Sequence, residues 1–378
     1  MLFSADAALW FLMNGAAARN LRHIHRLPAA QTNLPPTAPP SVTVILAARD
    51  EEERIENTLR HLLEIRDVDL EIVVVDDRSR DRTPEILDRV CRDNPRVHRI
   101  RVDTLPDGWL GKCHACHLGA AKAQGHWLLF TDADCWIQPD VLSRAIQTAL
   151  REKADHLALT PGIPPDHLSG MAWHCTYPVL VANWLAGVNR DRRRSYMGVG
   201  AFNLLTREAY QAVGGHETLR LTVVDDVKLG LLLQRAGRRT RVYLGGPEVE
   251  CHWGHTAWGI LGLTEKNCFA MVDYRIVLGL GGGIFPLAFW LLACIGPFHG
   301  SLPGWLAWAG LISFMLPAAR VARRLGWSPW LALLTPFLIP ILPLAALNST
   351  VRTLWRGGVR WRDTFYPLAL LRAHNVRR

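Results

Sequence analysis

The sequence predicts an α/β protein with a mostly parallel sheet flanked by helices, joined to a carboxyl-terminal membrane region. Apolar runs of strand length alternate with segments of helical periodicity between residues 41 and 131. Acidic residues follow several of these runs, and long apolar stretches appear after residue 275. Because strands that alternate with helices form parallel sheets, which bind ligands at the carboxyl ends of their strands, we expect the acidic residues at a ligand-binding edge.

Each element has its own local pattern. The first strand run leads into the acidic cluster 49–53, which suits the start of a helix. The second run is rich in β-branched residues and ends at two aspartates, after which a turn and a helical pattern lead to a short strand. The last run ends at an Asp-x-Asp triplet. The four strand runs are 41–48, 70–75, 97–102 and 127–131.

The triplet Asp132-Ala133-Asp134 places two carboxylates where a buried strand is expected to emerge. Mg²⁺ and Mn²⁺ favour oxygen ligands and are commonly held by one or two carboxylates together with substrate phosphate oxygens. The triplet is therefore a candidate site for a divalent metal that carries a nucleotide diphosphate. Asp-x-Asp triplets also occur in solvated loops, so this interpretation depends on agreement with other motifs.

Other motifs agree with that interpretation, and their order along the chain is the specific part of the signal. The motifs are Ala48-Arg49-Asp50-Glu51-Glu52, Val75-Asp76-Asp77-Arg78-Ser79, Gly108-Trp109-Leu110-Gly111-Lys112, Thr131-Asp132-Ala133-Asp134, Gly198-Val199-Gly200-Ala201-Phe202, Arg207-Glu208-Ala209-Tyr210, Val213-Gly214-Gly215-His216-Glu217 and Val224-Asp225-Asp226. This set resembles the family-2 glycosyltransferases, which have the GT-A fold, over about residues 41–275. The Gly-Trp-x-Gly-Lys element and the apolar carboxyl end are most similar to the membrane-bound branch that glycosylates lipids, including hopanoid-associated, carotenoid and ceramide-type glycosyltransferases.

The resemblance implies a site for a nucleotide-sugar donor, with UDP as the favoured nucleotide. Asp76 and Asp77 match the pair that contacts the nucleoside, and the alternative for them is an ordinary turn with a helix cap. Lys112 opens a predicted helix, so its ammonium and the amino end of the helix would face the donor phosphates. The alternative for this lysine is a solvated surface position. The other implied donor contacts are Ala48, Arg49, Glu51 and Asp132.

The resemblance also implies a metal site and a catalytic base. Asp134 matches the ligand of Mg²⁺ or Mn²⁺, with Asp132 beside it, and the metal and Lys112 would neutralise the leaving diphosphate. Asp225 and Asp226 match the position of the base in this inverting family. An acceptor hydroxyl must lose its proton as it attacks, so a nearby carboxylate is the simplest base. Asp226 is the predicted base and Asp225 orients the loop or the acceptor, although the two could be exchanged, and a plain helix cap is the alternative.

One departure from the family pattern concerns processivity. Processive and ceramide-type members carry Gln-x-x-Arg-Trp after the base, whereas this chain has His252-Trp253-Gly254-His255 and then Glu265-Lys266-Asn267. The loss argues against a polysaccharide synthase. His255 or Lys266 could replace the missing arginine as a diphosphate contact, and the alternative is an amphipathic helix lying at the membrane.

Composition and hydropathy divide the rest of the 378-residue chain, whose net charge is +9 and whose calculated pI is near 9.4. The stretch 276–294 is free of charge and approaches the roughly 30 Å thickness of the hydrocarbon layer at about 1.5 Å per residue. The stretches 302–319 and 327–347 follow, and prolines interrupt the second of these two. The expected segments are an amino-terminal apolar interfacial helix (1–27), a proline-rich linker (28–40), a GT-A catalytic domain with interfacial helices (41–275), a membrane region of two spans plus a proline-rich segment that spans or re-enters (276–350), and a basic cytoplasmic tail (351–378).

The positions of the arginines predict the orientation in the membrane. Arginines precede the first span and lie between the second and third, whereas the linker 297–304 has none. Because positive residues mark the cytoplasmic side, we expect a multi-pass protein of the cytoplasmic (inner) membrane whose catalytic domain faces the cytoplasm. The basic tail stays cytoplasmic only if the proline-rich stretch returns or lies at the interface. A cytoplasmic domain keeps its cysteines reduced, and zinc binding by Cys113 and Cys116 is disfavoured because helix packing explains these thiols better.

The predicted activity is the transfer of one sugar from a nucleotide-sugar, favoured as UDP-linked, to a lipid acceptor at the membrane. A polyprenyl-phosphate glycosyltransferase is the alternative of the same class. A membrane scaffold whose GT-A-like domain has lost activity is the alternative of another class, and intact Asp134 and Asp226 argue against it. Nucleic-acid binding is disfavoured because the arginine clusters lie beside apolar spans. The oligomeric state is left open.

Overall fold

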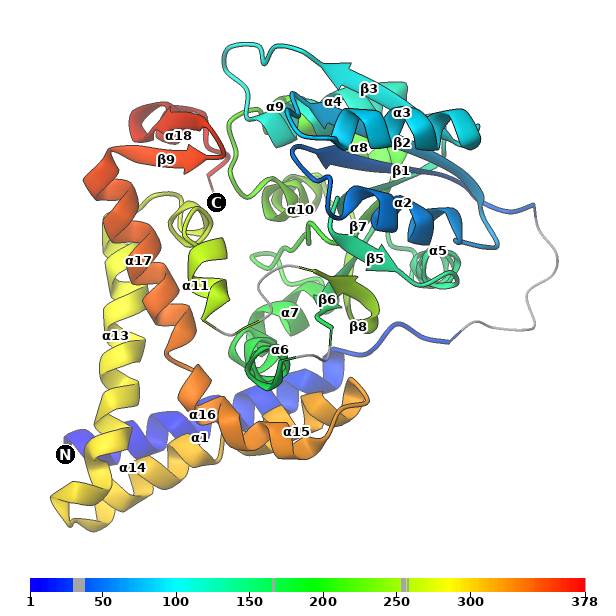
Figure 1. Cartoon of the computed structure of the whole chain (residues 1–378). Coiled ribbons are helices and arrows are strands. Elements are labelled where there is room, and N and C mark those ends of the chain that lie inside the picture. The colour runs from blue at the N-terminus through cyan, green and yellow to red at the C-terminus, as the bar shows by residue number, and fades with distance from the viewer. Residues whose placement is uncertain (30–37, 165–166, 253–255, 257, 378) are drawn as a thin grey trace. The chain divides into compact units, whose positions relative to one another are not determined.

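The computed structural model describes residues 1–29, 38–164, 167–252, 256 and 258–377, and these form two compact units. The sheet unit comprises residues 25–162 and 187–253, and the helical unit comprises residues 1–24, 163–186 and 254–377. Figure 1 shows the chain with its helices and strands labelled. Each unit is built from segments that are distant in sequence.

The sheet unit is organised around eight strands in the order β3-β2-β1-β4-β7-β6-β8-β5. β1 pairs in parallel with β2 and β4, β2 with β3, and β6 with β8, whereas β7 and β5 pair antiparallel with their neighbours. The first four strands occupy the four predicted runs, so the predicted α/β sheet is confirmed. The strands are β1 (Ser41–Ala48), β2 (Asp69–Asp77), β3 (Val97–Val102), β4 (Trp127–Asp132), β5 (Cys135–Ile137), β6 (His156–Gly162), β7 (Asn203–Thr206) and β8 (Thr240–Cys251).

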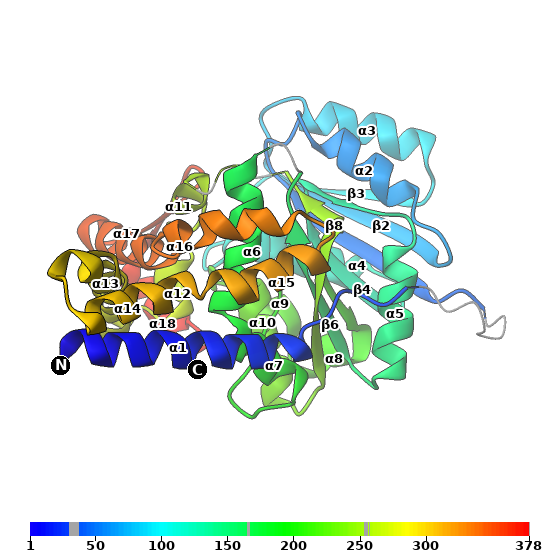
Figure 2. The ribbon, with the colours of Figure 1, turned by 90° about the horizontal axis from the view of Figure 1, so that it is seen from below.

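Helices cover both faces of these strands, and alternate residues of β2 show how. Ile72 and Val74 pack in one buried cluster with residues of α2 and α3, whereas Val73 and Val75 pack in another with Ala115 of α4. This is the two-residue period that a strand buried on both faces requires. Figure 2 shows α2 and α3 along one face of the sheet. The helices of this unit are α2 (Ile55–Leu63), α3 (Thr83–Asp93), α4 (Gly111–Lys122), α5 (Val141–Arg151), α8 (Arg207–Ala212), α9 (Gly215–Thr218) and α10 (Asp225–Arg235).

The helical unit contains the apolar helices at the two ends of the chain. In Figure 1, α13 and α17 lie side by side, and α1 runs along α14 crosswise to them. The elements of this unit are α1 (Leu2–Asn20), α6 (Leu168–Leu180), α11 (Gly259–Leu263), α12 (Cys268–Met271), α13 (Ile276–Ile295), α14 (Leu302–Ile312), α15 (Met315–Arg324), α16 (Thr335–Leu338), α17 (Ile341–Arg356), α18 (Leu368–His374) and the antiparallel hairpin of β9 (Gly358–Trp361) and β10 (Thr364–Pro367), while α7 (Ala182–Asn189) begins in this unit and ends in the sheet unit.

Glycines determine how closely α13 packs on α17. A Cβ atom added at Gly279 would lie 2.5 Å from the Thr350 Oγ1 atom, and one added at Gly283 would lie 2.3 Å from the Leu347 Cγ atom. Small residues four positions apart let apolar helices approach in this way. Within the glycine run 281–283, Gly283 makes this contact.

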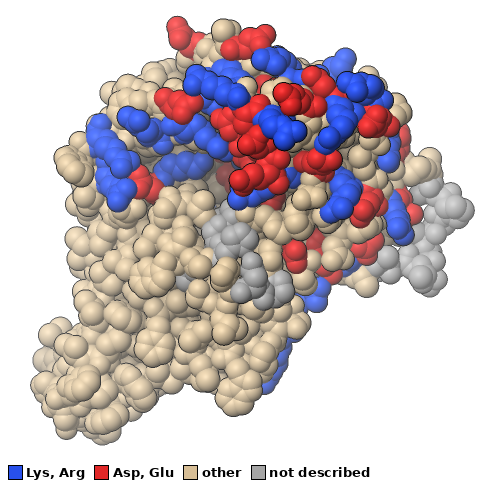
Figure 3. All heavy atoms as spheres, in the orientation of Figure 1, with Lys and Arg blue, Asp and Glu red and all other residues tan. Residues whose placement is uncertain are grey.

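Three segments are long and apolar enough to cross a membrane: Ile276–His299, Leu302–Arg324 and Pro329–Arg356. Figure 3 shows that the face formed by α1 and α14 carries almost no charged side chains. Large apolar side chains on α1, α13 and α14 are exposed, and examples are Phe11, Leu12, Val277, Phe285 and Trp305. Lipid-facing helices have this composition.

Candidate active site

The carboxyl ends of β1, β2 and β4 place four of the predicted site residues at one edge of the sheet. Ala48 pairs with Asp76 across β1 and β2, and Ala47 pairs with Asp132 across β1 and β4. The parallel register therefore brings the ends of all three strands to the same level. Asp77 follows Asp76 at the end of β2.

The two aspartates of β2 have different surroundings. The Asp76 carboxylate is buried and accepts hydrogen bonds from the Ser79 backbone N–H (3.1 Å) and the Arg99 guanidinium (2.7 Å), so both of its oxygens serve the fold. Asp77 forms a two-point ion pair with the Arg78 guanidinium, with N···O distances of 2.8 and 3.0 Å. A Cβ atom added at Gly111 would lie 2.1 Å from Asp77 Oδ2, so the first residue of α4 must be glycine for this pair to fit.

The loops after β1 and β2 are tied together. The backbone N–H of Asp50 donates to Ser79 Oγ, that of Glu51 donates to Thr83 Oγ1, and that of Arg80 donates to Asp50 Oδ1. Asp50 and Arg78 adopt positive φ angles of 54° and 61°. The acidic cluster 49–53 was expected to start a helix, but α2 begins only at Ile55, because these cross-loop hydrogen bonds hold the cluster as a loop.

Lys112, Asp132 and Asp226 converge on the backbone of Gly200. The Lys112 ammonium lies 2.6 Å from Asp132 Oδ1, and the Gly200 N–H donates to Asp226 Oδ2 at 2.7 Å. A Cβ atom added at Gly200 would lie 2.9 Å from Asp132 Oδ2, 3.3 Å from Lys112 Nζ and 3.4 Å from Asp226 Oδ2. Side chains from α4, β4 and α10 thus surround a single glycine.

Opposing effects set the charge of Lys112. Burial would lower its pKa, but the carboxylates of Asp132, Asp225 and Asp226 raise the pKa well above its ordinary value. The ammonium is therefore held charged beside three acids. The Lys112 side chain is 25% exposed, so it is accessible to an anionic ligand.

Asp132 and Asp134 form the group that suits a divalent cation. Oxygens of both carboxylates and the Cys135 sulfur lie within 4.8 Å of one another. Burial, with the neighbouring charges of Asp132 and Glu51, raises the pKa of Asp134 to about 6. A carboxyl group whose charge is disfavoured in this way gains from a nearby cation, so these oxygen donors fit Mg²⁺ or Mn²⁺.

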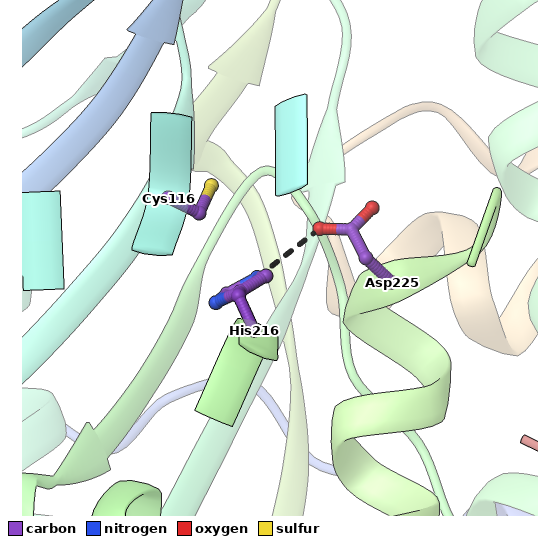
Figure 4. A group of neighbouring side chains, drawn as sticks. All are labelled: Cys116, His216 and Asp225. Carbon is purple, nitrogen blue, oxygen red and sulfur yellow. Dashed lines mark hydrogen bonds and ion pairs between the residues drawn. The ribbon is translucent and has the colours of Figure 1, made fainter. Parts of the chain in front are cut away.

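The acidic pair at the start of α10 lies in a second buried cluster, which Figure 4 shows in part. Asp225 Oδ2 lies 3.3 Å from Nε2 of His216, the second residue of α9, and the Cys116 sulfur of α4 lies within 4.8 Å of both. The other ring nitrogen of His216, Nδ1, lies 2.9 Å from the Tyr210 hydroxyl. Burial, together with Asp225, raises the pKa of the Cys116 thiol, which therefore packs in its neutral form.

Asp225 and Asp226 differ in their ionisation. Burial opposes the charge of Asp225, but Lys112 and His216 overcome this and lower its pKa to about 2. Burial raises the pKa of Asp226 to about 6, and the adjacent charge of Asp225 adds to that effect. The two carboxylates therefore divide into one that stays charged and one that can take up and release a proton near neutral pH.

The geometry of this site does not test two of the predicted residues. His255 lies outside the described residues. Lys266 belongs to the helical unit, where its ammonium lies 3.5 Å from the centre of the Trp361 ring. Their predicted contact with a diphosphate stays a prediction.

The sequence motifs identified the acidic residues of the site but did not identify several of the other residues that form it. These are Arg78, Arg99, Gly200, Tyr210 and His216. Four of them lie inside or next to quoted motifs, but nothing in the motifs shows which atoms they contact. Arg99 is on β3, where its alternation with buried residues gave no sign of a buried ion pair.

The motif order and this geometry agree with a comparison to protein families. Residues 43–214 match the family described as glycosyl transferase family 2. This segment of the chain is therefore similar to that family.

The relatives are similar over most of their length. A 4,4'-diaponeurosporenoate glycosyltransferase of Staphylococcus aureus (strain bovine RF122 / ET3-1) is 28% identical over 350 residues, covering 87% of this chain and 89% of that protein. The enzyme of the same name from Staphylococcus aureus (strain USA300) is 26% identical, and the match covers 94% of each chain. That of Staphylococcus haemolyticus (strain JCSC1435) is 29% identical over 201 residues, 52% of each chain.

A solved structure has the same fold. It is the mannosyltransferase PcManGT from Pyrobaculum calidifontis in complex with GDP-Man and Mn²⁺, with a TM-score of 0.56 and 19% sequence identity. The match covers 94% of this chain and 99% of that one. The predicted GT-A fold is confirmed by this likeness.

Proposed function

We propose that this chain is an inverting, non-processive glycosyltransferase that moves one sugar from a nucleotide-sugar to a lipid acceptor in the membrane. The observation that carries the proposal is the convergence of Lys112, Asp132 and Asp226 on Gly200. This arrangement combines a charged ammonium, a carboxylate pair suited to a metal, and a carboxylate that can exchange a proton near neutral pH. A metal-assisted, inverting transfer to a hydroxyl group uses all three kinds of group.

The donor side is formed by the edge of the sheet. Asp77 is the proposed contact for the nucleoside, because its oxygens pair with the side chain of the adjacent loop residue Arg78, whereas Asp76 is held inside the fold by the Ser79 backbone and Arg99 of β3. The Lys112 ammonium and the amino end of α4 would face the donor phosphates, where positive charge stabilises the leaving group. UDP remains the favoured nucleotide on the family resemblance, and PcManGT was solved with GDP-Man and Mn²⁺.

The metal proposal rests on the two carboxylates of the Asp-x-Asp triplet. Asp134 and Asp132 would hold Mg²⁺ or Mn²⁺, and the raised pKa of Asp134 supports this because a cation would relieve its unfavourable charge. A bound divalent ion would supply charge neutralisation of the diphosphate as it leaves.

In the transfer step, Asp226 of α10 has the role of the base. Where the acceptor group is a hydroxyl, its oxygen attacks the anomeric carbon of the sugar, its proton passes to the Asp226 carboxylate, and the bond from the anomeric carbon to the diphosphate oxygen breaks; a carboxylate acceptor would attack in its ionised form, with no proton to transfer. A single displacement of this kind inverts the anomeric configuration. A base whose pKa lies near the working pH is the most effective, and the pKa of Asp226 is raised to about 6.

The helical unit and the relatives support the lipid acceptor. The relatives' printed name identifies diaponeurosporenoate as what those enzymes glycosylate, so a carotenoid-type or other polyisoprenoid lipid is the proposed acceptor class. The apolar surface of the helical unit would let such a lipid be presented without leaving the membrane. The enzyme would be a multi-pass protein of the cytoplasmic membrane that works from its cytoplasmic side.

The test is to incubate the purified chain with a panel of nucleotide-sugars, Mn²⁺ or EDTA, and a lipid extract, and to analyse the lipids by mass spectrometry. We expect a sugar-bearing lipid in the Mn²⁺ samples and its loss in EDTA. Asp134→Asn and Asp226→Asn should lose the product while circular dichroism shows them folded. Unchanged turnover in Asp226→Asn would remove the base assignment, and a product on a lipid phosphate would favour a polyprenyl-phosphate acceptor.

A further inference from the structure

The buried imidazole of His216 lies beside the acidic pair Asp225 and Asp226, and the proposed reaction has so far given it no role. Its side chain is almost completely buried, and both ring nitrogens have partners. Nδ1 lies 2.9 Å from the Tyr210 hydroxyl, and Nε2 lies 3.3 Å from Asp225 Oδ2. A buried polar side chain held on two sides has a defined orientation.

The hydrogen-bond partners favour one tautomer of this histidine. The His216 backbone N–H donates to the Tyr210 hydroxyl at 2.9 Å, so the hydroxyl accepts there and has its own proton left to donate to Nδ1. Nε2 then carries the ring proton and donates it to Asp225. Tyr210 thus turns the donor of His216 toward the carboxylate.

Gly215 lets the Tyr210 ring pack closely against the backbone next to His216. Gly215 adopts a φ of +51°, and a Cβ atom added there would lie 2.3 Å from Cζ of the Tyr210 ring. The glycine before His216 therefore lets the tyrosine ring lie against the backbone. The segment from Tyr210 to His216 is shaped so that hydroxyl, imidazole and carboxylate follow in line.

We propose that His216, oriented by Tyr210, is a positioning residue that donates a hydrogen bond to Asp225, so that Asp225 stays charged and fixed while its neighbour Asp226 takes the proton of the acceptor. This inference rests on the proposed function, since it explains how one acid of the pair becomes the base. His216 touches no reacting atom in this scheme.

The charges around the pair support this division. Asp226 has the Gly200 N–H as its hydrogen-bond donor, whereas Asp225 has His216 and the nearby Lys112 ammonium. Loss of the imidazole donor would destabilise the state in which Asp225 and Asp226 are both charged. The pKa that limits activity on the acid side of the pH profile would therefore rise. The titratable and charged groups that face the pair are Lys112, Cys113, Cys116, Asp132, Tyr210 and His216.

The experiment compares His216→Leu and His216→Gln in the lipid glycosylation assay over pH 5–9. Leucine fills a similar volume without a donor, whereas the glutamine amide can still donate from near the Nε2 position. In His216→Leu we expect kcat to fall about tenfold or more and the acid limb of the pH profile to move upward by about one unit, with KM for the donor little changed. In His216→Gln we expect kcat to stay close to that of the wild type and the acid limb of the pH profile to lie at its wild-type position.

A merely structural histidine would give a different pattern. Activity would then follow the folded fraction, both variants would lose it alike, and the acid limb would stay where it is in the wild type. That result would overturn the proposal. His126→Leu, at an exposed position ahead of β4, is the control that should change neither rate nor pH profile.

A second readout does not depend on turnover. In ¹⁵N-histidine-labelled protein, the His216 resonances are assigned by their absence from His216→Gln, and we expect the Nε2-protonated tautomer, which Tyr210→Phe should disturb. An Nδ1-protonated ring would overturn the proposal even if no donor sugar is found, so its failure is distinguishable from failure of the proposed function. Stoichiometric Zn²⁺ lost in Cys116→Ser would also overturn it, because Cys116, His216 and Asp225 would then be metal ligands.

Discussion

Asp225 and Asp226 are adjacent in sequence but differ in what surrounds them. Lys112 and His216 keep Asp225 charged, while burial and the charge of Asp225 raise the pKa of Asp226 to about 6. A base acts only when deprotonated, so we expect kcat to rise with pH through about 6 and then level off. A pH profile of lipid glycosylation measures this. A rate that is flat between pH 5 and 8 would contradict the role of Asp226.

Gly200 provides a test of the convergence itself. Gly200→Ala introduces a Cβ atom 2.9 Å from Asp132 Oδ2 and 3.3 Å from Lys112 Nζ, so the side chains must move apart. Because small misplacements of reacting groups are costly, we expect activity to fall about a hundredfold while the protein stays folded. Gly262→Ala is the matched control, since its Cβ atom would meet nothing within 4 Å. Equal activity in the two variants would show that the site is not organised around Gly200.

The positions of the acids were predictable from sequence, but the contacts that distinguish each acid from its neighbour were not. The motifs and the expected sheet edge identified Asp76, Asp77, Asp132 and Asp134, because a carboxylate at a strand end is a local pattern. Whether a carboxylate is used by the fold or left for a ligand depends on a residue elsewhere in the chain. Arg99 of β3 donates a hydrogen bond to Asp76 and so engages it within the fold, and His216 does the same for Asp225.

Strand β3 carries two arginines whose ion pairs differ in burial. Arg99 pairs with Asp76, which is 1% exposed, whereas Arg101 pairs with Asp103 at the surface. Arg99→Met would leave a buried carboxylate without its cation, and we expect it to lower the free energy of unfolding by about 3 kcal/mol. The matched change Arg101→Met should cost about 0.5 kcal/mol or less. Urea unfolding followed by tryptophan fluorescence measures both, and equal losses would contradict this account of β3.

The helices show where local patterns are sufficient. The apolar periodicity of α2 and the lysine that opens α4 were both readable, because an amphipathic or capped helix is specified by neighbouring residues. The start of α2 was misplaced, since hydrogen bonds from the loop after β2 hold the acidic cluster. The contact of α13 with α17 depends on Gly279 and Gly283, and only the packed structure shows which glycines are used.

Helix α1 buries some polar side chains and exposes several large apolar ones. Asp6 and Asn14 are buried, and the Asn14 amide donates to the Gly310 carbonyl of α14, whereas Phe11 and Leu12 are exposed. This inverted pattern suits a lipid surrounding better than water. The proposed interfacial position of α1 is consistent with it.

The crosswise arrangement of α13 and α14 makes the membrane topology testable. If α13 crosses the membrane, the connection at 297–301 lies on the outer side and the tail stays in the cytoplasm. We expect a cysteine at Ser301 to react with an impermeant maleimide added outside intact cells, and a cysteine at His374 to react only after the cells are opened. The wild type gives the background. Labelling of His374→Cys from outside would contradict the cytoplasmic tail.

The most direct test of the account is the structure of the lipid product. We predict that the purified enzyme, given one nucleotide-sugar and the lipid extract, yields a lipid that carries a single sugar whose anomeric configuration is opposite to that of the donor. Mass spectrometry counts the sugars and NMR coupling constants give the configuration. A ladder of sugars, a retained configuration, or a sugar released only to water would contradict the proposal that this site transfers one sugar to a membrane lipid by direct displacement.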